Sequence, residues 1–160
     1  MKILQYLFIS LSHKILKILP YRLIRLLSVP IGTLYFLLTF RSSIKLFKRR
    51  KIFEKLKINY KPLIVKINYT RYWLETLWLT NKNFSKHITP HVEIENQEYV
   101  DKLKKQYPGL IFALPHLGNW EFAIPIGNSI KLNLLAVAEP LSNSYVLNWF
   151  KTLRESLGIE

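Results

Sequence analysis

The sequence predicts an α/β protein in which membrane-associated helices precede a partial parallel α/β domain. Basic residues are concentrated in the first 90 residues, which hold 18 Lys and Arg against two acidic residues, whereas residues 91–160 hold 6 against 8. In the second half, short apolar runs alternate with helical patterns, which is typical of parallel strands joined by right-handed helical crossovers. We therefore divide the chain into residues 1–61, 62–90 and 91–160.

The first 40 residues have the pattern of apolar helices with cationic edges. The longest uncharged stretch, Leu26–Phe40, has 15 residues, whereas a helix needs roughly 20 to cross a bilayer. Lys14 and Lys17 share one helix face, and so do Arg22 and Arg25, as in helices that lie in the membrane interface. We predict helices that lie in or dip into one leaflet. A single span and a buried helical hairpin with solvated lysines are the alternatives.

Residues 41–61 form the densest basic block of the chain, with nine Lys and Arg against Glu54 alone. Apolar residues recur between these charges at spacings of three to five, which predicts a basic amphipathic helix. An anionic membrane surface attracts such residues by about 1 kcal/mol each. A solvated helix face is the alternative. Nucleic acid is an alternative anionic partner. Surfaces that bind nucleic acid rarely interrupt their basic residues with apolar runs such as Leu34–Leu38, which argues against it.

Residues 62–90 are predicted to form an aromatic helical segment followed by a linker. Helical spacing continues through residues 63–80, where Tyr and Trp suit either a membrane–water interface or a core-facing stripe. Asn81–His91 is polar and is expected to be non-helical. His87 and His91 are four residues apart, but no third ligand accompanies them, so we expect surface histidines and no metal site. The chain has no Cys, which excludes disulfides, thiolate nucleophiles and thiolate metal sites.

Residues 91–160 carry the strand–helix alternation. The expected elements are a short strand at Val92–Ile94, a helix at Gln97–Gln106, a buried strand at Leu110–Leu114, a short helix from Trp120, a strand at Leu132–Ala138 and a helix over residues 143–157. Asn119 and Asn143 are the expected N-caps of the last two helices. His116 and Glu139 then follow the carboxyl ends of two strands, where the functional residues of such sheets gather.

A histidine and a carboxylate five positions apart are the main chemical signal of the chain. A turn through Gly118 would fold Glu121 back toward His116, so that the carboxylate holds one ring proton and the other nitrogen deprotonates an alcohol. No Ser or Cys nucleophile is evident nearby, which suggests that the substrate brings its own hydroxyl. Backbone N–H groups of Leu117, Gly118 and Asn119 are candidates for oxyanion stabilisation. The alternative is a histidine that caps a strand end.

Three blocks of sequence resemble a known family. Residues 113–121 read Ala-Leu-Pro-His-Leu-Gly-Asn-Trp-Glu and resemble the His-x4-Asp/Glu motif of the lipid A late-acyltransferase family. Within that family they are most similar to the phosphatidylinositol mannoside acyltransferases of actinobacteria. Residues 137–141, Phe150 and residues 154–158 agree with a second block, and residues 72–75 with a weaker third one. The resemblance covers nearly the whole chain.

The resemblance implies a membrane-bound O-acyltransferase on the cytoplasmic face of the inner membrane. Its donor would be acyl-CoA or acyl-carrier protein, and its acceptor a hydroxyl of a membrane glycolipid or lysophospholipid. No cofactor and no metal is expected. His116 would be the general base and Glu121 its orienting carboxylate, while the substrate would meet Gly118, Asn119, Glu139 and Arg154.

The resemblance implies more specific roles for two of these residues, Arg154 and Glu139. Arg154 would hold a phosphate of the acceptor or of the donor's pantetheine arm, which suits its forked guanidinium. Lipid A enzymes often have Arg where this chain has Glu139, which favours the mannoside branch. Family members continue for nearly as long again, so the resemblance also implies an N-terminal fragment. A non-catalytic membrane adaptor and a nucleic-acid-binding module are the alternative functions.

Overall fold

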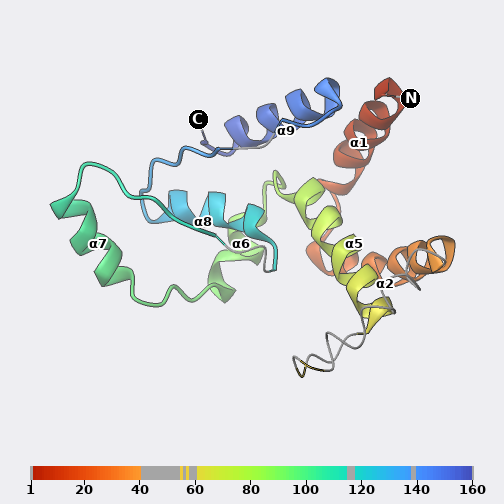
Figure 1. Ribbon diagram of the computed structural model, residues 1–160, viewed down its shortest axis with the longest axis horizontal. Helices are drawn as coiled ribbons and strands as arrows, with labels where there is room; N and C mark the ends of the chain where they lie inside the picture. The colour runs from red at the N-terminus through yellow and green to blue at the C-terminus, as the bar shows by residue number, and fades with distance from the viewer. Residues whose placement is uncertain are drawn as a thin grey trace.

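Helices form the regular structure of this chain (Figure 1). The computed structural model describes residues 2–40, 55, 57, 61–114, 118–137 and 140–159. Over these ranges it contains seven α-helices and two short 3₁₀ helices, and no strand. Most of the predicted basic helix of residues 41–61 lies outside the described residues, and so do His116 and Glu139.

Three helices build the first half of the fold: α1 (Lys2–Leu16), α2 (Tyr21–Leu38) and α5 (Pro62–Trp78). They meet in a core that includes Ile24 of α2 and Trp78 of α5, both fully buried. The indole Nε1 of Trp78 donates a hydrogen bond to the carbonyl of Leu19, between α1 and α2, at 2.8 Å. A buried indole needs such a partner, so this bond fixes where the α1–α2 connection crosses α5.

The contact between α2 and α5 depends on Gly32. A Cβ built at Gly32 would come within 2.6 Å of the Cα of Ile67, which no side chain can do without moving a backbone. The helix continues through Pro30, so the glycine lies within an unbroken face. Small residues allow helix backbones to approach each other in this way, and the α2–α5 pair is therefore joined backbone to backbone.

An apolar surface remains exposed on α1 and α2. On α1 the exposed residues follow a helical stripe, and on α2 they cover most of the helix away from α5. The surface consists of Leu4, Leu7, Phe8, Leu11, Ile15, Leu26, Val29, Leu34, Leu37 and Leu38. By length and composition, α2 is also able to cross a membrane: it has 18 residues with a mean hydropathy of 1.3, near the N-terminus. Both the interfacial and the spanning interpretation of the sequence thus keep support.

Short helices follow α5. The segment expected to be a non-helical linker contains α6 (Phe84–His87) and a 3₁₀ turn, η1 (Thr89–His91), so that expectation was wrong. The reason is Phe84, which is buried against Trp78 at a ring distance of 6.0 Å and anchors the turn. His87 and His91 are exposed, as predicted. The predicted helix α7 (Gln97–Gln106) is confirmed and lies apart from the other helices in Figure 1.

The last elements bring the end of the chain back to its beginning. After η2 (Trp120–Phe122) and α8 (Ala123–Ser129), helix α9 (Ser144–Ser156) packs beside α1 (Figure 1). Asn143 caps α9 through the N–H of Tyr145, as expected, and its amide also donates to the carbonyl of Lys2 at 3.0 Å. The buried face of α9 consists of Val146, Phe150 and Leu153.

The predicted parallel sheet is absent from the described residues. Val92–Ile94, Leu110–Leu114 and the described part of Leu132–Ala138 are irregular, and Leu134 alone forms a parallel bridge, with Ile159. A parallel strand is stable only when neighbours accept and donate its backbone hydrogen bonds, and no ladder of that kind forms over the described ranges. The apolar residues of these runs, among them Ile111 and Val137, are consequently exposed.

Candidate functional site

The motif turn is formed by Gly118 and Asn119. Gly118 has a φ of +62°, in the left-handed region that glycine adopts without strain. The Oδ1 atom of Asn119 accepts a hydrogen bond from the N–H of Glu121 at 3.2 Å, which caps η2. The predicted turn through Gly118 and the predicted cap are therefore both confirmed, and together they fix the direction in which residue 121 leaves the turn.

Glu121 is held by Arg154. The carboxylate is 1% exposed, and it accepts Arg154 Nη2 at 2.6 Å and Arg154 Nε at 3.2 Å. This is the forked arrangement that guanidinium and carboxylate groups favour. The hydrogen bond to Glu121 raises the pKa of Arg154 more than burial lowers it, so the arginine stays charged. The ion pair joins the motif turn to α9 across 33 residues of sequence.

Glu75 is a second buried carboxylate beside the turn. Its Oε1 accepts the hydroxyl of Tyr21 at 3.0 Å, and its Oε2 accepts the amide of Asn119 at 3.3 Å. Glu75 thereby connects α2 with the motif turn. It was not among the site residues expected from sequence, although it is one of only two acidic residues among the first 90, and an isolated acid in a basic, apolar segment is a signal for a buried partner.

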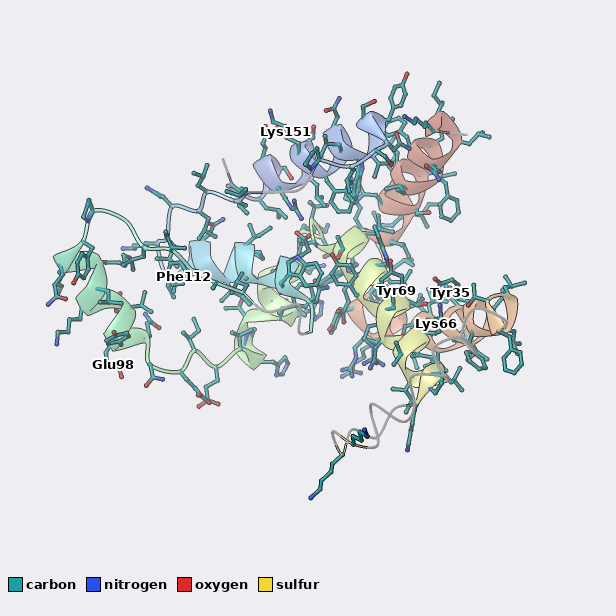
Figure 2. All side chains as sticks on the ribbon, in the orientation of Figure 1. Tyr35, Lys66, Tyr69, Glu98, Phe112 and Lys151 are labelled. Carbon is teal, nitrogen blue, oxygen red and sulfur yellow. The ribbon has the colours of Figure 1, made fainter. Side chains whose placement is uncertain are left out.

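A cavity of about 480 Å³ opens between α5 and the motif turn. One wall is a strip of α5 and the other is the turn; the lining residues are Asn68, Tyr69, Arg71, Tyr72, Glu75, Gly118, Asn119 and Trp120. Figure 2 shows Tyr69 on α5 close to Lys66, with Tyr35 of α2 nearby. The volume is within the range of small-molecule sites.

Two aromatic rings pack against each other at one side of the cavity. The ring centroids of Tyr72 and Trp120 lie 4.9 Å apart, which ties α5 to the turn. Burial, and then the negative charge of Glu121, raise the pKa of Tyr72 to about 12. The phenol is therefore neutral at physiological pH and acts as a hydrogen-bond donor or acceptor, not as a general base.

The structure brings together four of the six site residues expected from sequence. Gly118 and Asn119 line the cavity, and Glu121 and Arg154 form the ion pair behind the turn. The other two, His116 and Glu139, lie outside the described residues. In the described parts of the chain, no group of three His, Asp or Glu side chains is arranged to hold a metal ion.

A comparison with known protein families gives a match over the whole chain. Residues 1–160 match a family model described as bacterial lipid A biosynthesis acyltransferase. No curated protein and no solved structure matches the sequence. The family match includes both the helical first half and the segment that carries the His-x4-Glu motif.

Proposed function

Because this chain belongs to the bacterial lipid A biosynthesis acyltransferase family, we propose that it moves a fatty acyl group from acyl-CoA or acyl-carrier protein to a hydroxyl of a membrane glycolipid. Members of this family are membrane-associated O-acyltransferases that act on lipids. The observation that supports the proposal within the chain is the motif turn, which lines a cavity on one side and is followed by the buried carboxylate of Glu121 behind it.

In the proposed reaction His116 is the general base. One imidazole nitrogen takes the proton of the acceptor hydroxyl while the oxygen attacks the carbonyl carbon of the thioester. The tetrahedral intermediate then collapses, the C–S bond breaks, and the departing thiolate receives the proton from His116. An ester and a free thiol result, and the enzyme is regenerated.

Glu121 orients the base in this scheme, and Arg154 positions Glu121. An ionised carboxylate offers about four lone-pair directions, so two bonds from Arg154 leave room for an imidazole N–H. The pairing with Glu121 occupies Nε and Nη2 of Arg154. We therefore assign Arg154 a positioning role, in preference to the phosphate-binding role that the resemblance implies.

The proposal also specifies the class of lipid that accepts the acyl group. Glu139 favours a phosphatidylinositol mannoside over a lipid A precursor, because the lipid A branch of the resemblance often has Arg there. The exposed apolar surface of α1 and α2 supports a location at the cytoplasmic face of the inner membrane, where acyl thioesters and lipid acceptors meet.

Substitution of the base tests the function. With His116→Ala, we expect acyl transfer to membrane glycolipids to fall by roughly 10²–10⁴-fold, measured by mass spectrometry of lipid products, while the protein stays membrane-bound. His91→Ala, which removes an exposed histidine, is the matched control and should be neutral. Unchanged product from His116→Ala would remove the proposed base. Separate assays with a lipid A precursor and a phosphatidylinositol mannoside identify the acceptor.

A further inference from the structure

Arg71 lies in the cavity wall, and within the described residues neither its Nε nor its charge has a partner. Its Nε is buried, and no hydrogen-bond acceptor reaches it anywhere in the described ranges. The same ranges contain no ion pair to its guanidinium. Arg154, on the far side of the turn, is by contrast held by two bonds to one carboxylate. A buried N–H that lacks an acceptor is costly, and proteins rarely keep one unless something else binds it.

Two buried carboxylates of this region, Glu75 and Glu121, accept hydrogen bonds from other residues. Glu75 lies one helical turn further along α5, but its two oxygens accept Tyr21 and Asn119. Glu121 accepts both bonds from Arg154. Within the described residues, the cavity therefore presents an arginine whose charge no acidic side chain pairs with directly.

The remaining lining groups suit an oxygen-rich ligand. Asn68 and Asn119 contribute amides, and the phenol of Tyr72 is a neutral donor. The planar guanidinium matches two oxygens of a phosphate group. The volume of about 480 Å³ exceeds that of a phosphate alone and leaves room for the part of the molecule that carries it.

We propose that this cavity binds a phosphate ester group of a substrate, with Arg71 as its principal ligand. The inference rests on the proposed acyl transfer, and it adds a binding residue that the motif does not contain. Two substrates of such a reaction carry a phosphate ester: the acceptor lipid in its headgroup and the thioester donor in its pantetheine arm. The chemistry of recognition is the same for both.

Direct binding measurements test the site without requiring turnover. The full chain in detergent is titrated with 4′-phosphopantetheine and with pantetheine for the donor, and its flotation is compared on vesicles containing phosphatidylinositol or diacylglycerol for the acceptor. The wild type should favour the phosphate-bearing probe of at least one pair. Arg71→Gln should reduce that preference about tenfold or more, and Arg71→Lys should retain part of it.

A control variant separates the effect of the cavity arginine from the effect of the overall positive charge. Arg22→Gln removes the same charge from an exposed position on α2 that does not line the cavity, and it should leave the preference unchanged. Thermal unfolding of each variant shows whether Arg71→Gln is folded, and Arg71→Lys serves in its place if it is not. The pair of probes whose preference Arg71→Gln abolishes identifies the substrate that the cavity binds.

The outcomes distinguish this site from the proposed function. If the wild type shows no phosphate preference, or if Arg71→Gln and Arg71→Lys keep it in full, the site is refuted, whether or not acyl transfer is observed. If Arg71→Gln loses the preference while the wild type transfers no acyl group, the phosphate site stands and the proposed function fails. An equal loss in Arg22→Gln would attribute the effect to surface charge and would also refute the site.

Discussion

At the scale of single residues, the ion pair between Glu121 and Arg154 is short and buried, with the carboxylate 1% exposed. Its carboxylate is removed from water, so the loss of its partner would leave a charge buried without compensation. A second pair of the same charge types, Lys151 and Glu155, lies at 3.8 Å on the exposed side of α9. The two pairs share a helix and differ in burial, which makes them a natural comparison.

We predict that Arg154→Gln lowers the free energy of unfolding by about 2–3 kcal/mol, at the lower side of values for broken buried pairs because the arginine side chain is 25% exposed. Lys151→Gln should cost less than about 0.5 kcal/mol. Denaturant unfolding in detergent micelles measures both. Equal small losses in the two variants would show that Arg154 contributes little to holding Glu121.

Gly118 provides a second prediction at this scale. A Cβ at Gly118 meets no atom within 4 Å, so the cost of Gly118→Ala is due to its positive φ alone. We expect roughly 1 kcal/mol of destabilisation, with a larger effect on acyl transfer because the turn directs Glu121. Gly109→Ala is the matched control, since its surroundings are also open and its φ is not in the left-handed region. If the two variants unfold alike, the turn carries no such strain.

At the scale of elements, His13 connects α1 to the end of α5. Its Nδ1 donates to the carbonyl of Leu77 at 2.8 Å, and its ring meets Trp149 of α9 edge-on at 5.5 Å. Burial lowers the pKa of His13; the bond to Leu77 opposes this shift, and the charge of Lys17 adds to it. The neutral imidazole therefore belongs to the packed arrangement of α1, α5 and α9.

This arrangement predicts a dependence of stability on pH. Because the folded-state pKa lies below the unfolded value of 6.5, the unfolded chain binds more protons, and stability falls as the pH drops through 6.5 toward the folded pKa. Above that window the contribution is fully present. Thermal unfolding across pH 5–8 should show this loss in the wild type and a smaller one in His13→Gln. His87→Gln, at an exposed position, should leave the profile unchanged, and a profile equally flattened by both changes would exclude His13 as the cause.

The helices could be predicted from sequence because their signals are local. Gln97–Gln106 was predicted to the residue, and the N-cap of α9 follows from a single asparagine, Asn143. The predicted strands were wrong over the described residues, because a parallel strand depends on neighbours that no local pattern specifies. Glu75 was missed for a related reason: its partners Tyr21 and Asn119 are 54 and 44 residues away.

At the scale of the whole molecule, charge and apolar surface both favour the membrane. The chain carries a net charge of +14, and α1 and α2 expose side chains that would be buried in an ordinary core. An anionic bilayer satisfies both features at once, since basic residues bind its headgroups while apolar side chains enter the acyl boundary.

We predict that Phe8→Ser and Leu11→Ser on α1 each weaken binding to anionic vesicles by roughly tenfold, as expected when a large apolar side chain no longer leaves water. Flotation at physiological salt measures the loss. Leu135→Ser removes an equally exposed apolar side chain from the irregular segment after α8, and it should have little effect. If Leu135→Ser matches the α1 variants, the membrane contact is not confined to the first helices.

The contact at Gly32 has a consequence for how deeply the protein reaches into lipid. Since α2 and α5 touch through their backbones, no acyl chain fits between them there, and α5 must follow whenever α2 sinks, rises or tilts. Arg71 and the other cavity residues of α5 would move together with α2. A change in the depth or tilt of α2 in a bilayer would therefore change the height of the cavity relative to the lipid headgroups.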